Sequence, residues 1–276
     1  MNNPLVTVEE LAAERATGRP LVLADVRWTL NGPSGRADYE AGHLPGAVYV
    51  DLEAELTTHG PSGGRHPLPD LGTFQLAMRR IGVSAATPVV VYDGATSLAA
   101  SRLWWLLTDA GHPSVRVLDG GFAGWRAAGQ PVETGPGAAP APGDFVVAPG
   151  HRRVVDAAGV AALLDGEVAL VDVRAADRYA GENETIDPVA GHIPGAVSRP
   201  STQNLTEAGG FRPAAEIAER FADVVGEPVL YCGSGITAAH TLLALESAGR
   251  TGALYPGSWS DWITDPARPR ATGSTP

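Results

Sequence analysis

Cysteine occurs only once among the 276 residues, and this scarcity excludes several classes of protein. A single cysteine forms neither an internal disulfide nor a cluster of thiolate metal ligands, so nothing ties the chain to an oxidising compartment. A reduced, cytoplasmic setting is therefore the expectation.

Positive charge is also scarce, because 20 Lys+Arg face 31 Asp+Glu and leave a net charge of -11. That balance repels nucleic-acid phosphates and anionic lipid, and no local stripe of basic residues offsets it. Long apolar runs are missing, and the first residues lack a basic start followed by an apolar stretch, so neither a transmembrane helix nor a signal peptide is expected. We expect no nucleic-acid partner and no membrane partner.

Cofactor signatures are missing as well. The sequence has no Walker or Rossmann fingerprint, and its seven histidines are scattered beside the one cysteine. Neither a cofactor nor a bound metal is expected.

What the chain does have is an internal repeat, in which four landmarks occur twice in the same order. The pairs are residues 21–27 with 169–174, 42–47 (GHLPGA) with 191–196 (GHIPGA), 88–94 with 228–233, and 118–125 with 254–262. Residues 131–144 (PVETGPGAAPAPGD) have a composition that resists both helix and strand. The sequence therefore predicts two copies of one domain, residues 1–130 and 145–276, joined by a linker at 131–144.

Within each half, short apolar runs alternate with stretches of helical pattern. Helices are expected at 8–16, 73–80, 157–164, 214–224 and 237–248. This alternation predicts an α/β fold in which a mainly parallel central sheet is flanked by helices. In such sheets ligands bind beyond the carboxyl ends of the strands, where a strand turns into a helix.

The paired histidines His43 and His192 and the paired strand-end residues Asp25 and Asp172 occur in both halves. Because the half without a cysteine keeps them, a structural role is favoured over catalysis. We expect the histidines to satisfy backbone groups of a Gly-His-x-Pro-Gly turn and the aspartates to form local ion pairs or caps.

Cys232 lies between a predicted strand and a predicted helix. It follows the apolar run 227–231, which reads as a central strand, and precedes Gly233-Ser234-Gly235, which leads into a helix. The two glycines let the backbone curl so that several N–H groups point inward at a helix N-terminus, and such a nest stabilises a thiolate or a persulfide anion. The sequence therefore predicts a reactive, nucleophilic cysteine.

The chain resembles the two-domain rhodanese-type sulfurtransferases in four features. These are the tandem layout, the paired Gly-His-(Leu/Ile)-Pro-Gly-Ala motifs, the run Tyr255-Pro256-Gly257-Ser258-Trp259 and the loop Cys232-Gly233-Ser234-Gly235-Ile236-Thr237. The resemblance covers almost the whole chain. It implies two rhodanese-like domains, of which the C-terminal one is catalytic through a cysteine that takes sulfane sulfur from a donor and passes it to a thiophile. In the N-terminal copy Asp93 stands at the cysteine position, which implies that this domain is inactive.

The loop is most similar to that of 3-mercaptopyruvate sulfurtransferases, since thiosulfate enzymes typically carry Arg directly after the cysteine. The resemblance implies that Ser234, His66 and Glu53 form a triad-like group beside the donor, with Glu in place of the usual Asp. It also implies substrate binding by the loop residues Gly233, Gly235, Ile236 and Thr237.

A keto-acid donor needs cations for its carboxylate, and Arg matches a carboxylate with two N–H groups. The resemblance implies that Arg178 supplies the first cation, whereas Asp187 stands at the position of the second. Arg65 and Arg199 are candidate substitutes.

Three alternatives stay open beside 3-mercaptopyruvate as donor. The first is a thiosulfate sulfurtransferase; the second is a non-enzymatic module that relays sulfur between proteins. The third, a phosphatase, is disfavoured because its loops are one residue longer and end in Arg, whereas this loop reaches Thr237-Ala238 without one. The expected partners are a small-molecule sulfur donor and an acceptor that is a thiol, such as a thioredoxin-like protein, or cyanide.

Overall fold

The structure is a computed structural model that describes residues 3–60, 64–164, 166 and 168–276. It divides into two compact units. Unit 1 comprises Met1–Thr58, Pro69–Arg152 and Glu207–Phe211, and unit 2 comprises His59–Leu68, Arg153–Thr206 and Arg212–Pro276. Among the described residues, no helix is long and apolar enough to cross a membrane.

These units differ from the predicted domain boundaries at residues 59–68, 131–152 and 207–211. The predicted linker, 131–144, has no regular helix or strand but belongs to unit 1, where the Gly143 N–H donates to Arg79 O at 2.8 Å and Glu133 N–H to His43 O at 2.9 Å. Conversely, residues 59–68 belong to unit 2, where Arg65 N–H donates to Ser260 Oγ at 3.0 Å. Composition identified irregular chain at 131–144, but main-chain hydrogen bonds decide which unit a segment joins.

Unit 1 is built on a five-stranded parallel sheet in the order β1-β5-β4-β2-β3. Its strands are β1 (Leu5–Val6), β2 (Val22–Asp25), β3 (Val48–Tyr49), β4 (Val89–Tyr92) and β5 (Val115–Leu118). Every residue of β2 and β4 is buried, as expected of central strands covered on both faces.

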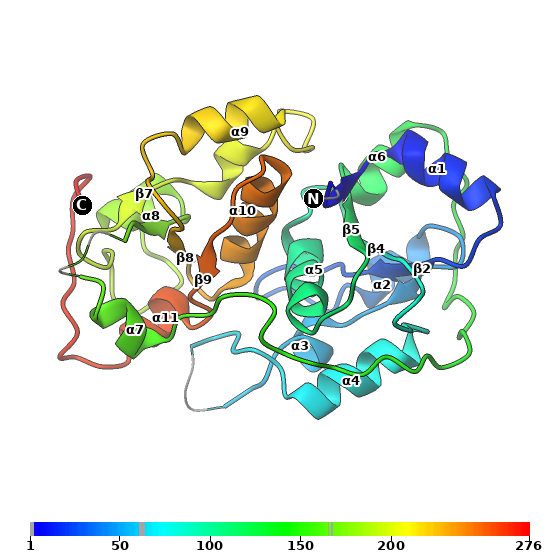
Figure 1. Cartoon of the computed structure of the whole chain (residues 1–276), viewed down its shortest axis with the longest axis horizontal. Coiled ribbons are helices and arrows are strands. Elements are labelled where there is room, and N and C mark those ends of the chain that lie inside the picture. The colour runs from blue at the N-terminus through cyan, green and yellow to red at the C-terminus, as the bar shows by residue number, and fades with distance from the viewer. Residues whose placement is uncertain (1–2, 61–63, 165, 167) are drawn as a thin grey trace. The chain divides into compact units, whose positions relative to one another are not determined.

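The helices of unit 1 are α1 (Val8–Ala16), α2 (Arg36–Ala41), α3 (Leu52–Glu55), α4 (Leu71–Arg80), α5 (Leu98–Asp109) and α6 (Gly121–Ala127). The first begins at a capping box, in which Thr7 and Glu10 each accept a hydrogen bond from the other's backbone N–H. The longest helix, α5, packs against β4 and β5 (Figure 1). Its Trp104 and Trp105 are buried. It thereby fixes the loop that joins β4 to it.

Unit 2 repeats this plan with a four-stranded parallel sheet in the order β7-β6-β8-β9. Its strands are β6 (Leu170–Asp172), β7 (Val197–Ser198), β8 (Val229–Tyr231) and β9 (Ala253–Leu254). A single parallel bridge between Val154 and Leu254 takes the place that the β1–β5 pairing has in unit 1. The two sheets therefore have the same order of strands, and the predicted repeat is confirmed.

The helices of unit 2 are α7 (Ala157–Ala161), α8 (Ala176–Ala180), α9 (Ala214–Arg220), α10 (Ile236–Ser247) and α11 (Ser258–Trp262), with a 3-10 turn, η1 (Ser201–Asn204). Nine residues of α10 are buried, and the helix packs on β8, β9 and α9 (Figure 1). Because β8 and α10 form the centre of the unit, the loop between them is held on both sides by buried structure.

The Gly-His-x-Pro-Gly motifs have matching structural roles in the two units. His43 Nδ1 lies 2.9 Å from Tyr39 O and His192 Nδ1 lies 2.9 Å from Tyr179 O, and each imidazole stacks on that tyrosine ring. Both histidines are fully buried. They fasten the turn to the preceding helix.

The strand-end aspartates form the expected local ion pairs. Asp25 pairs with Arg27 at 3.1 Å, and Asp172 pairs with Arg174 at 2.6 Å. All four side chains are at least nine-tenths buried. The pairs therefore lie inside the units, next to the ends of β2 and β6.

Candidate active site

Cys232 lies at the carboxyl end of β8, directly before the loop that opens α10. Its side chain is buried, with 2% of the residue exposed. The Gly235 N–H points at the sulfur, with N and Sγ 3.1 Å apart. Ile236 and Thr237 form the first turn of α10, so the sulfur faces the N-terminal end of a twelve-residue helix.

The glycine at 235 is required by the backbone. Its φ of +84° falls in the left-handed region, and a Cβ there would lie 2.5 Å from Pro256 O. Any larger residue would push the loop away from the segment before α11, and the N–H group that faces Sγ would move with it.

The start of α11 fastens the loop from the other side. Trp259 N–H donates to Cys232 O and Ser260 N–H donates to Gly233 O, both at 3.0 Å. The Ser258 hydroxyl accepts a hydrogen bond from Cys232 N–H at 3.1 Å and lies 4.0 Å from Sγ. Sequence reasoning missed Ser258 as a site residue, although the run 255–259 in which it lies had been recognised as part of the repeat.

Next to the cysteine, Ser234 and His66 are in direct contact. Ser234 Oγ lies 2.7 Å from His66 Nδ1, and the two residues are 7% and 5% exposed. A buried hydroxyl held by an imidazole is the arrangement that moves a proton to or from a reacting group. Both residues belong to unit 2.

Glu53, the predicted acid of the triad, lies on α3 in unit 1. Its Oε1 accepts a hydrogen bond from Trp28 Nε1 at 2.6 Å. The role expected for Glu53, orienting the imidazole of His66, stays a prediction.

Arg178, the predicted carboxylate ligand, lies on α8 and is already engaged by two acids. Its Nε and Nη2 donate to Glu184 at 2.9–3.2 Å, and Nη2 also donates to Asp187 Oδ2 at 3.0 Å. Burial raises the pKa of Glu184, but the backbone N–H groups of Asp187 and Ile186, with Arg178, outweigh it and hold that pKa below its usual value. Glu184 therefore stays ionised beside Arg178 to a lower pH than an ordinary glutamate would.

The two candidate substitutes for the missing arginine differ in position. Arg65 binds Asp187 through Nη1 and reaches the catalytic loop, since a Cβ on Gly233 would lie 2.6 Å from its Nη2. Arg199 instead pairs with Asp223 at 2.5 Å and donates to the carbonyls of Arg220 and Ser198. The structure thus brings Arg65, and not Arg199, to the loop.

In unit 1, Asp93 occupies the position of the cysteine in the same kind of loop. Its carboxylate accepts four backbone hydrogen bonds at 2.9–3.3 Å, from the N–H groups of Ala95, Ser97, Ala99 and Ala100. Burial raises the pKa of Asp93, while the four N–H groups oppose that shift. The loop after β4 is a nest for an anion, and here the anion is a side chain of the loop itself.

Comparison with known proteins identifies the type of domain in each half of the chain. A model of the rhodanese-like domain matches the chain twice, at residues 7–128 and 156–265. The chain belongs to the rhodanese family. The two matches correspond to the two halves of the repeat.

Two curated relatives match almost the whole chain. It is 44% identical over 280 residues to the "Probable 3-mercaptopyruvate sulfurtransferase" of Pseudomonas aeruginosa, covering 98% of each chain. It is 43% identical to the "Putative thiosulfate sulfurtransferase SseB" of Mycobacterium tuberculosis, over 98% of this chain and 97% of that one. The crystal structure of SseA from Escherichia coli, a 3-mercaptopyruvate sulfotransferase, superposes with a TM-score of 0.81 at 33% identity, covering 94% of this chain and 100% of SseA.

Several predictions from the sequence are confirmed by these findings: the family, the α/β fold with two rhodanese-like domains, and the enzyme class, a sulfurtransferase. The relatives carry the names of two different donors. The identity of the sulfur donor therefore has to be inferred from the residues of this chain.

Proposed function

We propose that this protein transfers sulfane sulfur from 3-mercaptopyruvate to an acceptor through a persulfide on Cys232. The observation that carries the proposal is the Ser234–His66 contact of 2.7 Å, in the loop whose Gly235 N–H faces Cys232 Sγ. A thiosulfate donor leaves as sulfite and needs no proton on carbon, whereas mercaptopyruvate leaves as an enolate that must be protonated. A buried hydroxyl–imidazole pair suits the second task.

In the first half-reaction the Cys232 thiolate attacks the sulfur of mercaptopyruvate. The S–S bond forms as the C–S bond breaks, the electron pair of that bond goes to C3 of the donor, and the resulting enolate takes up a proton to become pyruvate. Ser234 and His66 would deliver that proton, and Arg178 would hold the donor carboxylate. Glu53 would orient His66, and the loop residues Gly233, Gly235, Ile236 and Thr237 would surround the persulfide.

In the second half-reaction the outer sulfur leaves Cys232 with an external nucleophile. The chain has no second cysteine that could resolve the persulfide as a disulfide, so the acceptor has to come from outside. A small thiol, a thioredoxin-like protein or cyanide would fit this role. A cytoplasmic location is proposed with it, because a reducing compartment supplies thiols and keeps the single cysteine reduced.

Intact-mass measurement after donor treatment tests the proposal. Incubation with 3-mercaptopyruvate is expected to add one sulfur, about 32 Da, to the wild-type protein, as a covalent intermediate requires, and to release one pyruvate. Cys232→Ser removes the nucleophile and is expected to show neither. Ser247→Ala is the matched control, since Ser247 lies at the other end of α10, where it bonds Ala244 O.

Two outcomes would contradict the proposal. A mass gain with thiosulfate but not with mercaptopyruvate would show that thiosulfate is the donor. A gain with mercaptopyruvate that is unchanged in Cys232→Ser would place the persulfide elsewhere.

A further inference from the structure

Two guanidinium groups converge on the residue that follows the catalytic cysteine. A Cβ atom on Gly233 would lie 2.6 Å from Arg65 Nη2 and 3.7 Å from both Nη atoms of Arg178. The bare glycine is what lets the two cations approach the loop. This supplies the pair of arginines that a donor carboxylate needs, although only one of them stands where the family resemblance places it.

A carboxylate already lies between these two cations. Asp187 Oδ1 accepts a hydrogen bond from Arg65 Nη1, and Asp187 Oδ2 accepts one from Arg178 Nη2 at 3.0 Å. The side chain of Asp187 is 3% exposed. One oxygen on each guanidinium is also the arrangement by which two arginines would hold the carboxylate of an oxo acid.

The surroundings favour exchange of this carboxylate. Arg178 keeps Glu184 as a counter-ion when Asp187 leaves. Burial raises the pKa of Asp187; Glu184 adds to the rise, and Arg65 and Arg178 oppose it without cancelling it. The surroundings therefore disfavour the ionised form of Asp187, whereas those of Glu184 favour its ionised form.

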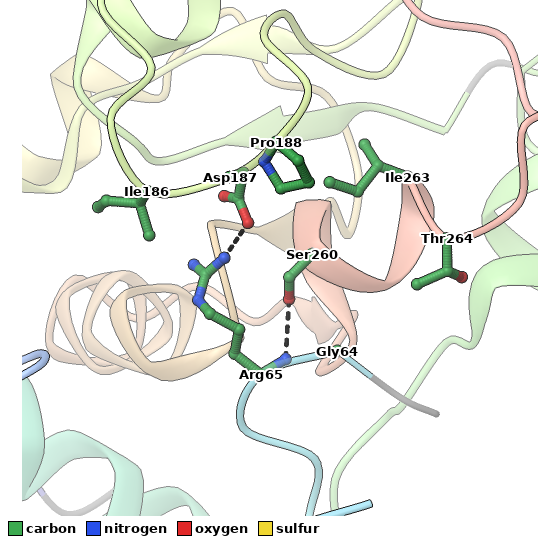
Figure 2. Close-up of a pocket in the computed structure, with 8 residues that line it drawn as sticks. All are labelled: Gly64, Arg65, Ile186, Asp187, Pro188, Ser260, Ile263 and Thr264. Carbon is green, nitrogen blue, oxygen red and sulfur yellow. Dashed lines mark hydrogen bonds and ion pairs between the residues drawn. The ribbon is translucent and has the colours of Figure 1, made fainter. Parts of the chain in front are cut away.

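Space for a displaced carboxylate lies next to the pair. Arg65 and Asp187 form part of the wall of a cavity of about 320 Å³, together with Ser260 and the apolar side chains of Ile186, Pro188 and Ile263. Figure 2 shows the side chains of Arg65 and Asp187 pointing toward each other in this wall. Replacement of Asp187 by a donor carboxylate would require its side chain to turn toward this cavity.

We propose that Asp187 occupies the carboxylate subsite of the donor, and that 3-mercaptopyruvate binds between Arg65 and Arg178 by replacing it. This inference rests on the proposed function for the identity of the donor. It makes Asp187 a specificity-determining residue that weakens the binding of carboxylate donors without taking part in sulfur transfer. It also makes Arg65 the second cation of the donor site.

The test separates binding from turnover. Pyruvate is the probe for binding, with its neutral amide as the control ligand, and calorimetry on Cys232→Ser protein avoids any reaction. Asp187→Asn keeps the shape of the side chain but removes its charge, so pyruvate is expected to bind about tenfold more tightly because one charge-assisted competitor is gone. The affinity for the amide is expected to stay unchanged, and Arg65→Ala is expected to weaken pyruvate binding.

Turnover gives the second readout, in protein that retains Cys232. Asp187→Asn is expected to lower KM for mercaptopyruvate by a similar factor and to leave kcat within about twofold, because competition acts on binding alone. Asp223→Asn is the matched control, since it removes the carboxylate from the Arg199 ion pair. Asp187→Ser serves as a second variant if Asp187→Asn does not fold.

Equal or weaker pyruvate binding by both Asp187 variants would overturn the inference, since it would mean that Asp187 positions the arginines and does not compete with the donor. Failure of the proposed function looks different: wild-type protein would not turn over mercaptopyruvate at all. The pyruvate measurement would still decide the role of Asp187 in that case.

Discussion

Replacement of Asp93 by alanine tests whether the loop after β4 depends on an internal anion. In the wild type, the two carboxylate oxygens of Asp93 accept hydrogen bonds from four backbone N–H groups, and 5% of the residue is exposed. Asp93→Ala removes all four acceptors at once. Two of these N–H groups belong to the loop, at Ala95 and Ser97, and two to the first turn of α5, at Ala99 and Ala100, so none of them can readily turn to another partner.

The expected loss follows from these contacts. A buried donor left without a partner costs about 1–3 kcal/mol, but water entering the space of the carboxylate can serve some of the four, and the cost of burying the charge disappears. We expect a net loss of about 3 kcal/mol in the free energy of unfolding. For a domain of this size that corresponds to a melting temperature lower by roughly 6–12 °C.

Thermal unfolding followed by circular dichroism measures this loss, with Asp93→Asn expected between the alanine variant and the wild type because one oxygen acceptor remains. Asp38→Ala is the control, since Asp38 is exposed and such substitutions change stability by about 0.5 kcal/mol or less. Sulfur transfer at 25 °C is expected to be unchanged in all three variants. A melting temperature of Asp93→Ala within about 2 °C of the wild type would refute the reasoning.

Two further predictions concern proton transfer and pH. Ser234→Ala and His66→Ala are each expected to lower kcat with mercaptopyruvate by about 100-fold, and the double variant by no more than the larger single loss, because the two groups act as one proton carrier; losses that multiply in steady-state kinetics would contradict this. Burial raises the pKa of Asp25 to about 6, against the opposing effect of Arg27. The Asp25 carboxyl therefore ionises at a higher pH in the folded state than in the unfolded state. The stability of wild type relative to Asp25→Asn is therefore expected to fall by about 2 kcal/mol as the pH rises from 4 to 6.5, and a difference in denaturant unfolding free energy that is independent of pH would contradict it.

The sequence predicted the architecture because the signals for it are local and occur twice. The helix predicted at 8–16 matches α1, which begins at a capping box, and the apolar runs before Asp93 and Cys232 form β4 and β8. The predicted ends of helices were less accurate than their positions. The helix expected at 157–164 ends at Ala161, after which the chain is irregular. Short helices end through tertiary contacts that the pattern of apolar residues does not encode.

Candidate site residues could be predicted only where they belong to a recognisable sequence motif. The reactive Cys232 was inferred from the loop sequence itself, whereas Ser234 and His66 were inferred from a resemblance. Asp187 was noted as an acid in place of an arginine, but its position between Arg65 and Arg178 depends on the fold of three separate segments. The neutralisation of Arg178 by Glu184 likewise depends on how the chain turns after α8.

Residues 59–68 connect the two repeats of the chain in an unexpected way. They come from the N-terminal half of the repeat, yet they are part of unit 2 and bring His66 to Ser234 and Arg65 to Asp187. A fragment cut at the boundary between the two repeats would keep the nucleophile but lose the imidazole and the second guanidinium. The two repeats are therefore not separable at that boundary, because the segment that holds His66 and Arg65 precedes most of the first repeat's own chain yet folds into unit 2.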